Sequence, residues 1–170
     1  LGAERAHDAD QLLEACARRL SHGRMLAFHF WMTARVTVLG SGTSHGVPMI
    51  GCTCAVCTSA DPRDRRTRAS IFIECAEGPN ILVDTSTDLR MQALTHGITR
   101  VDAILFTHSH ADHIMGLDDS RRFSQMQRAA IPCHADLQTA GSLKRSFYYA
   151  FDPTEAKGGG LPQIDLRAID

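Results

Sequence analysis

The sequence predicts a mixed α/β (or α+β) domain in which strands and helices pack in layers, and three observations support this fold class. Apolar segments with strand-like alternation are interspersed with segments in which apolar residues recur at helical spacing. The length of 170 residues suits one domain with an appendage, and 44% of the residues are hydrophobic, enough for a buried core. No apolar run reaches the roughly 18 residues of a membrane span, so no membrane partner is expected.

Residues 1–31 differ from the rest and are expected to be an amino-terminal extension outside the domain. Apolar residues at helical spacing over Asp8–Leu20 predict an amphipathic helix. Met32 then precedes an alternating run, Arg35–Gly40, that is typical of the first strand of an α/β domain. The domain is therefore expected to span residues 32–170, with a native start at Met25 or Met32.

Turn and capping residues predict the remaining elements in order. Strands are expected at 70–74 and 80–84, with a hairpin turn at Gly78-Pro79 between them. Thr85, Ser86 or Thr87 is expected to cap a helix that Gly97 ends. The later elements are a strand at 101–107, a helix at 111–128, a strand at 130–134, a helix at 136–146 and a strand at 164–168.

Four potential metal ligands lie directly after the strand predicted at 101–107. They are His108, His110, Asp112 and His113, within six residues. In an extended loop the side chains of His108 and His110 project to the same side and can reach one metal ion. Asp112 and His113, at the start of the next helix, can bind a second metal. Neutral imidazole and carboxylate are ligands that zinc and manganese favour, so the segment predicts a binuclear metal site.

This H-x-H-x-D-H segment resembles the signature of the metallo-β-lactamase superfamily. The resemblance implies an αββα sandwich with two catalytic divalent metals, Zn or Mn, at one edge. It also implies that Asp84, at the end of the 80–84 strand, orients the metal ligands without binding metal. The family needs three further ligands, whereas the sequence after His113 holds one histidine, His134. The missing ligands are expected beyond residue 170, with this chain forming the amino-terminal half of the sandwich.

A second motif, C-x-C-x-x-C, brings Cys52, Cys54 and Cys57 within six residues. Such a cluster, in a chain in which no export signal is recognised, is typical of metal ligation in a reducing cytoplasm rather than of a disulfide. Three thiolates can fill three corners of a tetrahedral structural zinc, which needs one more ligand. Within the superfamily the cluster resembles PhnP-type cyclic phosphodiesterases and PqqB-like proteins, and the intact histidine motif favours the PhnP type.

Two segments beside the cysteines are open to more than one interpretation. The glycines of Gly40–Pro48 let backbone N–H groups approach an anion, and His45 in this turn is expected to line the substrate site. Residues 61–70, at the end of the zinc-binding loop (residues 51–68), hold four arginines and two aspartates. The arginines either face a phosphate or form a solvated face with internal ion pairs, and the second interpretation is favoured.

The resemblance implies a binuclear metal-dependent phosphodiesterase that uses a metal-bound hydroxide, with Asp112 also accepting a hydrogen bond from the nucleophile. The expected substrate is a small cyclic phosphodiester, such as phosphoribosyl 1,2-cyclic phosphate or a 2′,3′-cyclic nucleotide. The formal net charge of −1 does not favour long nucleic acid. Two alternatives stay open: another hydrolase of the fold (a tRNA 3′-processing nuclease or a thioesterase), and a non-catalytic PqqB-like metal-binding accessory protein. Half a sandwich would expose an apolar face, so a homodimer is also expected.

Overall fold

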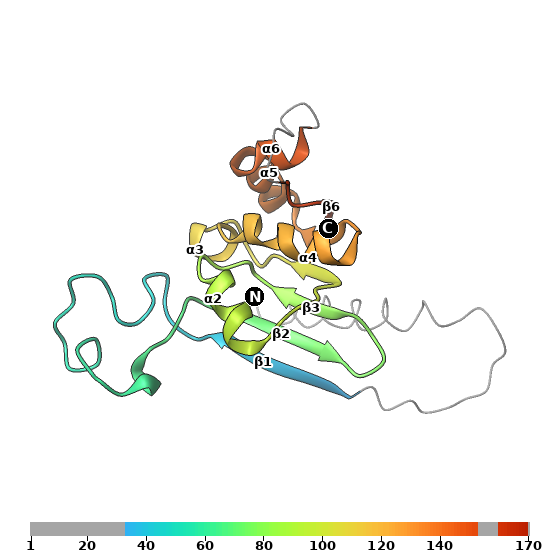
Figure 1. The fold of residues 1–170 in the computed structure, drawn as a ribbon. Helices are drawn as coiled ribbons and strands as arrows, with labels where there is room; N and C mark the ends of the chain where they lie inside the picture. Colours follow the sequence, from blue (N-terminus) through green and yellow to red (C-terminus); the bar gives the residue numbers. More distant parts are fainter. Residues whose placement is uncertain (1–32, 153–159, 170) are drawn as a thin grey trace, which may run out of the picture.

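The computed structural model describes residues 33–152 and 160–169 (Figure 1). The predicted extension at 1–31, with its helix over Asp8–Leu20, lies outside the described residues. Among the helices of the described ranges, none is long and apolar enough to cross a bilayer.

A six-stranded sheet forms the framework, and its strands lie side by side in the order in which they occur in the chain. β1 pairs antiparallel with β2 and β2 with β3, the second pair through a turn at residues 76–79, whereas β3 to β6 are parallel. Parallel neighbours need long crossover connections, which most of the helices occupy. The strands are β1 (Ala34–Gly40), β2 (Ser70–Cys75), β3 (Asn80–Val83), β4 (Ala103–Leu105), β5 (Ile131–Ala135) and β6 (Ile164–Ala168).

The helices pack against one face of this sheet. Side chains alternate between the two faces of a strand, and Phe72, Leu82, Ile104 and Cys133 are register neighbours on one face and are buried. They share a single core with Leu89 of α2, Phe123 of α4 and Leu143 of α5. The helical elements are α2 (Leu89–His96), α3 (Ala111–Ile114), α4 (Arg121–Gln127), α5 (Leu137–Ser146) and α6 (Tyr148–Phe151), with 3-10 turns η1 (Pro62–Asp64) and η2 (Leu117–Ser120).

The opposite face of the sheet is apolar over β1 and β2, and the described residues leave it uncovered there. Val36 and Val38 of β1 are each 58% exposed, and their register neighbours Ile73 and Ile71 are only half-buried. The described ranges thus contain one helical layer and one sheet, which is half of an αββα sandwich. The predicted α/β fold class is confirmed.

Two predicted helices differ from the observed ones. The helix expected over 111–128 is divided into α3, η2 and α4, because the chain must pass close to Ser86 at Gly116, where a Cβ atom would collide with the Ser86 carbonyl oxygen. The helix expected from Thr85 begins at Leu89 instead. The hydroxyl groups of Thr85 and Ser86 bond to Ile114 and Gln92 rather than capping the helix. Gly97 ends α2, as predicted, and does so in the left-handed conformation.

Candidate metal centre

The parallel pairing of β3 and β4 brings two chemically important loops to the same edge of the sheet. Asp84 follows β3 directly, and the histidine-rich segment 107–113 follows β4. The backbone N–H of Asp84 donates to the carbonyl oxygen of Leu105 at 2.8 Å, which extends the pairing beyond β3. The sequence folds this way because β3 and β4 bury Leu82 and Ile104 in the core, whereas the polar residues lie just past the ends of the strands.

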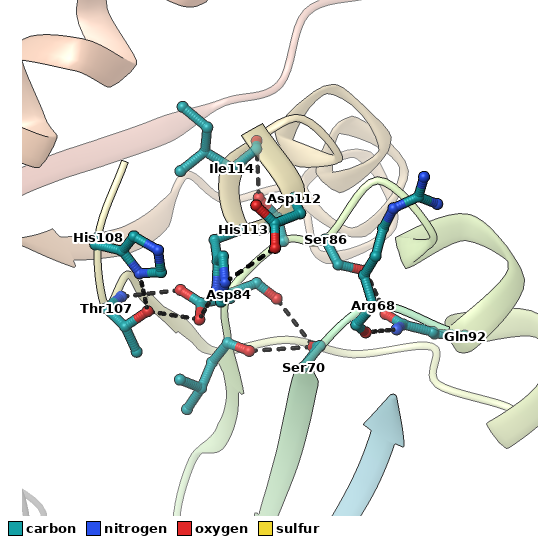
Figure 2. Close-up of polar contacts among 12 residues, drawn as sticks. Arg68, Ser70, Asp84, Ser86, Gln92, Thr107, His108, Asp112, His113 and Ile114 are labelled. Atoms are coloured by element: carbon teal, nitrogen blue, oxygen red, sulfur yellow. Dashed lines mark hydrogen bonds and ion pairs between the residues drawn. The ribbon is translucent and has the colours of Figure 1, made fainter. Parts of the chain in front are cut away.

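The carboxylate of Asp84 organises the histidine loop (Figure 2). Its Oδ1 accepts the backbone N–H of Thr107 at 2.9 Å, and its Oδ2 accepts the Thr107 hydroxyl at 2.8 Å and lies 2.7 Å from Nδ1 of His113. Asp84 is 4% exposed, and its φ of 61° lies in the left-handed region that Asp tolerates better than most residues. These contacts fit the predicted role of a residue that orients metal ligands.

The same hydrogen bonds determine which nitrogen of two histidine rings is free. An ionised carboxylate only accepts, so Nδ1 of His113 carries a proton, and in the neutral form of the ring Nε2 has a free lone pair. The Thr107 hydroxyl donates its single proton to Asp84, so it must accept from Nδ1 of His108, 2.9 Å away. In the neutral form of both rings Nε2 is therefore available, which is the form that a metal ion requires.

The four predicted ligands are neighbours at this edge, in pairwise contacts, but no three of them have donor atoms that all lie within 4.8 Å of one another. The ring of His108 has its centroid 4.6 Å from that of His110 and 4.0 Å from that of His113. Oδ2 of Asp112 is 3.3 Å from Nε2 of His113. Burial, followed by the neighbouring rings of His113 and His110, lowers the pKa of His108 below its ordinary value and favours the neutral ring. The donor set fits divalent metals, although assignment of ligands to each ion stays a prediction.

The three cysteines form a separate cluster between β1 and β2. Among the residues that the structure describes, Cys52, Cys54 and Cys57 are the one set of three or more potential ligands whose donor atoms all lie within 4.8 Å of one another. The backbone N–H of Cys57 donates to Sγ of Cys54 at 3.5 Å, and this bond together with the other thiols lowers the pKa of Cys54 to about 7. The cluster fits three corners of a zinc site, and His45 is not part of it.

The turn at Gly40–Pro48 serves close packing. A Cβ atom at Gly42 would lie 2.7 Å from the carbonyl oxygen of Arg66. The N–H of Gly42 donates to Thr67 and that of Gly46 to Thr43, both at 2.8 Å. The anion-binding interpretation is therefore wrong for these two amides. His45 lies in the exposed turn beside them, and its contact with substrate stays a prediction.

The arginines of residues 61–70 divide into two kinds. Arg63 pairs with Asp61 at 2.6 Å and is largely exposed, which matches the solvated face with internal ion pairs. Arg68 points inward instead, pairing with Asp88 at 3.0 Å and donating to the carbonyl oxygen of Ser44 at 3.1 Å. Sequence reasoning missed Asp88 and also Gln92, which is 2% exposed. The available signal was a glutamine three residues after Leu89, on the buried face of a helix.

Comparisons with known proteins agree with this fold. The Beta-lactamase superfamily domain matches residues 79–170, more than half of the chain. An octanoyltransferase of Porphyromonas gingivalis is 45% identical over 130 residues, which make up 76% of this chain and 26% of that protein. Coenzyme PQQ synthesis protein B of Methylobacterium nodulans is 34% identical over 93 residues, covering 47% of this chain and 31% of that protein.

Two solved structures share the fold. A new diphosphatase from the PhnP family superposes with a TM-score of 0.71 at 45% identity, covering 81% of this chain and 50% of that one. Zn(2+)-bound PqqB from Methylobacterium extorquens superposes with a TM-score of 0.59 at 23% identity, covering 81% of this chain and 46% of that one. The chain thus spans about half the length of these structures and 26 to 31% of the two curated relatives.

Proposed function

Because the chain belongs to the β-lactamase superfamily and has its metallo-β-lactamase fold, we propose that it provides half of the active site of a metal-dependent hydrolase acting on a small cyclic phosphodiester. The observation that carries the proposal is the cluster of His108, His110, Asp112 and His113, in which Asp84 bonds to His113 directly and to His108 through Thr107. The 45% identity to a PhnP-family diphosphatase supports a substrate with a phosphorus–oxygen bond to be hydrolysed.

His108 and His110 would hold one metal, and Asp112 and His113 the other. Metals bound there supply Lewis acidity: they polarise phosphate oxygens and lower the pKa of water toward neutrality. The protein fixes the orientation of the ligand side chains. Asp84 holds the Nδ1 proton of His113, and Oδ2 of Asp112 lies 3.3 Å from Nε2 of that ring, so both atoms could bind the same metal. The Asp112 carboxylate would also accept a hydrogen bond from an attacking nucleophile.

The cysteine cluster would bind a structural zinc that orders the loop at residues 51–68. Its three sulfur atoms already lie within 4.8 Å of one another, so little reorganisation is needed for binding. The remaining ligands of all three metals would come from outside the described residues. The net charge of −1 supports a small substrate rather than a long polyanion.

A second candidate is a metal-binding accessory protein of the PQQ synthesis protein B type, which the matches at 34 to 35% identity favour. The octanoyltransferase match covers 26% of that protein, so the transfer reaction in its name is not carried over. A thioesterase and a tRNA 3′-processing nuclease are further hydrolases of the fold.

The test is hydrolysis by the full-length protein loaded with Zn or Mn. The substrates are phosphoribosyl 1,2-cyclic phosphate, a 2′,3′-cyclic nucleotide, a diphosphate ester, an acyl thioester and a precursor tRNA. The proposal expects turnover of a cyclic phosphodiester and its loss in His110→Ala. Preference for the diphosphate ester, the thioester or the tRNA would overturn the substrate class, and no hydrolysis with all metals bound would favour the accessory protein.

A further inference from the structure

The segment between β1 and β2, residues 41–69, forms an arm that projects from the sheet and carries the cysteine cluster (Figure 1). Two backbone contacts hold its outgoing and returning ends together. The N–H of Gly42 donates to the carbonyl oxygen of Thr67 at 2.8 Å, and Val47 and Arg66 exchange two bonds of 2.8 Å. The arm therefore behaves as one unit, and its position depends on how the returning end is attached to the domain.

The side chain of Gln92, from α2, makes that attachment. Its Nε2 donates to Oγ1 of Thr67 at 3.0 Å and to the carbonyl oxygen of Arg68 at 2.9 Å. Its Oε1 accepts the hydroxyl of Ser86 at 3.0 Å. Both amide protons and the carbonyl oxygen are thus used, as a buried amide requires. Thr67 in turn donates to the carbonyl oxygen of Leu39 at the end of β1, at 2.9 Å.

Asp88 closes these contacts into a ring. Its carboxylate accepts the backbone N–H of Arg68 at 2.9 Å and the guanidinium of the same residue at 3.0 Å. Its own N–H donates to Oγ of Ser86 at 3.1 Å. The ring of Gln92, Arg68, Asp88 and Ser86 joins the arm to the loop after β3. Because these hydrogen bonds are directional and come from both segments, they restrict the position of the arm relative to that loop.

That loop is the one that supports the predicted metal ligands. Ser86 lies two residues after Asp84, and Thr85 between them donates to the carbonyl oxygen of Ile114 at the end of α3. The N–H of Gly116 donates back to the carbonyl oxygen of Thr85 at 2.9 Å. Figure 2 shows Arg68, Gln92 and Ser86 grouped on one side of Asp84. The arm and the histidine loop are therefore anchored to the same short segment, 84–86.

We propose that Gln92 is a positioning residue: it holds the arm against the 84–86 segment and so fixes the turn at Ser44 and His45, which is expected to face substrate. Arg68, a member of the ring, donates to the carbonyl oxygen of Ser44, so the ring also restricts the position of that turn. The inference rests on the proposed function for its kinetic part only. Gln92 does not hold the metal ligands, which Asp84 orients through separate bonds.

The first measurement is hydrogen exchange by mass spectrometry on the full-length protein with Gln92→Leu. The matched control is Gln127→Leu, because Gln127 is also an amide that bridges a helix to backbone, bonding N–H and C=O of Val101 at 2.9 Å each, with no contact to the arm. Exchange should rise at least about tenfold in peptides covering 41–69 in Gln92→Leu and stay unchanged there in Gln127→Leu. If exchange in the peptides covering 41–69 is unchanged in both variants, or rises equally in both, the proposal is overturned.

The second measurement is steady-state kinetics with the cyclic phosphodiester. Displacement of the turn at Ser44 and His45 should raise KM about 3–10-fold. The value of kcat should change less than about twofold, because metal ligation is intact. A purely structural role would instead lower the active fraction, and with it kcat, at constant KM. If Gln92→Leu does not fold, Thr67→Val is the second variant. It removes the hydroxyl that accepts from Gln92 without changing a residue of α2, and it should give the same rise in KM and in exchange. Exchange is measured without substrate. Unchanged exchange in Gln92→Leu would therefore contradict the role of Gln92, whereas absence of phosphodiesterase activity would contradict only the proposed function.

Discussion

Oδ2 of Asp84 lies 2.7 Å from Nδ1 of His113 and, at 2.8 Å, accepts the same Thr107 hydroxyl that holds Nδ1 of His108. One buried oxygen atom therefore determines the tautomer of two rings that are predicted to bind different metals. Loss of this carboxylate should affect both ions at once, although it touches neither directly.

We expect Asp84→Asn to weaken binding of both catalytic metals by about 10–100-fold and to destabilise the fold by about 1–3 kcal/mol. Asn retains one acceptor oxygen and places an NH₂ group against the donors Thr107 and His113. Metal affinity is measured by competition with a chelator, and stability by urea unfolding. Asp102→Asn is the control, because Asp102 accepts the N–H of Asn80 and pairs with Arg100 at the far end of β3. Equal metal affinity in the two variants would contradict this role for Asp84.

In metal-free protein, Cys54 should react with iodoacetamide with a half-maximal rate near pH 7, because its pKa is lowered to about 7. The thiolate is the reactive form, so the rate should fall about tenfold for each pH unit below that value. Cys133 is an internal control: burial raises its pKa to about 12, so it should stay unmodified at pH 8. Peptide mapping by mass spectrometry gives both rates.

Zinc content should separate the two metal sites. Cys52→Ser with Cys54→Ser should remove one zinc per chain and leave the other metals bound, as elemental analysis would measure. Cys75→Ser, outside the cluster, should remove none. Loss of every metal in the double variant would mean that the histidine loop binds no ion independently.

Gly116→Ala should destabilise the protein by about 1–3 kcal/mol, because the new methyl group meets the Ser86 carbonyl and lies 3.0 Å from Cβ of Leu89. Gly141→Ala should instead stabilise the protein. Gly141 lies within α5, where the nearest atom to a new Cβ is the flexible Arg145 guanidinium at 3.4 Å. Alanine in a helix interior is favoured over glycine by about 0.5–1 kcal/mol. Thermal unfolding of the two variants compares these effects, and a stabilised Gly116→Ala would refute the close approach.

The 170-residue chain should self-associate through the uncovered sheet face. Val36→Lys with Val38→Lys places two charges on that face, at positions that are already 58% exposed, and should shift the chain toward monomer. Sedimentation velocity measures the change. Arg35→Ala, on the opposite face of the same strand, is the control, and an equal effect of both changes would exclude this face as the contact.

Sequence patterns predicted the parts of the fold that depend on local chemistry. Alternation located β6 at the observed residues 164–168, and Asp136 caps α5 by accepting the N–H of Thr139. The histidine motif was recognisable because its ligands lie within one loop. The role expected of Asp84 came from the family resemblance, because an aspartate at the end of an apolar strand does not by itself indicate a contact with a loop more than twenty residues away.

The unpredicted parts depend on contacts between distant segments. Nothing near Gly116 in the sequence indicates that Ser86 will lie against it, so one helix was expected where three short elements form. The Arg68–Asp88 pair joins residues twenty positions apart, and Gln92 bonds to residues 24 and 25 positions away. Such partners become visible only when the tertiary fold is known.

The agreement between strand order and chain order has a consequence for biosynthesis. Each new strand pairs with the one made just before it, so no strand has to wait for a partner that is still untranslated, and none has to be inserted between two that are already paired. The sheet can grow from β1 to β6 at the pace of the ribosome. Assembly in this direction leaves two strand edges open at any moment, the outer edge of β1 and the edge of the newest strand, and only the second changes as the chain grows.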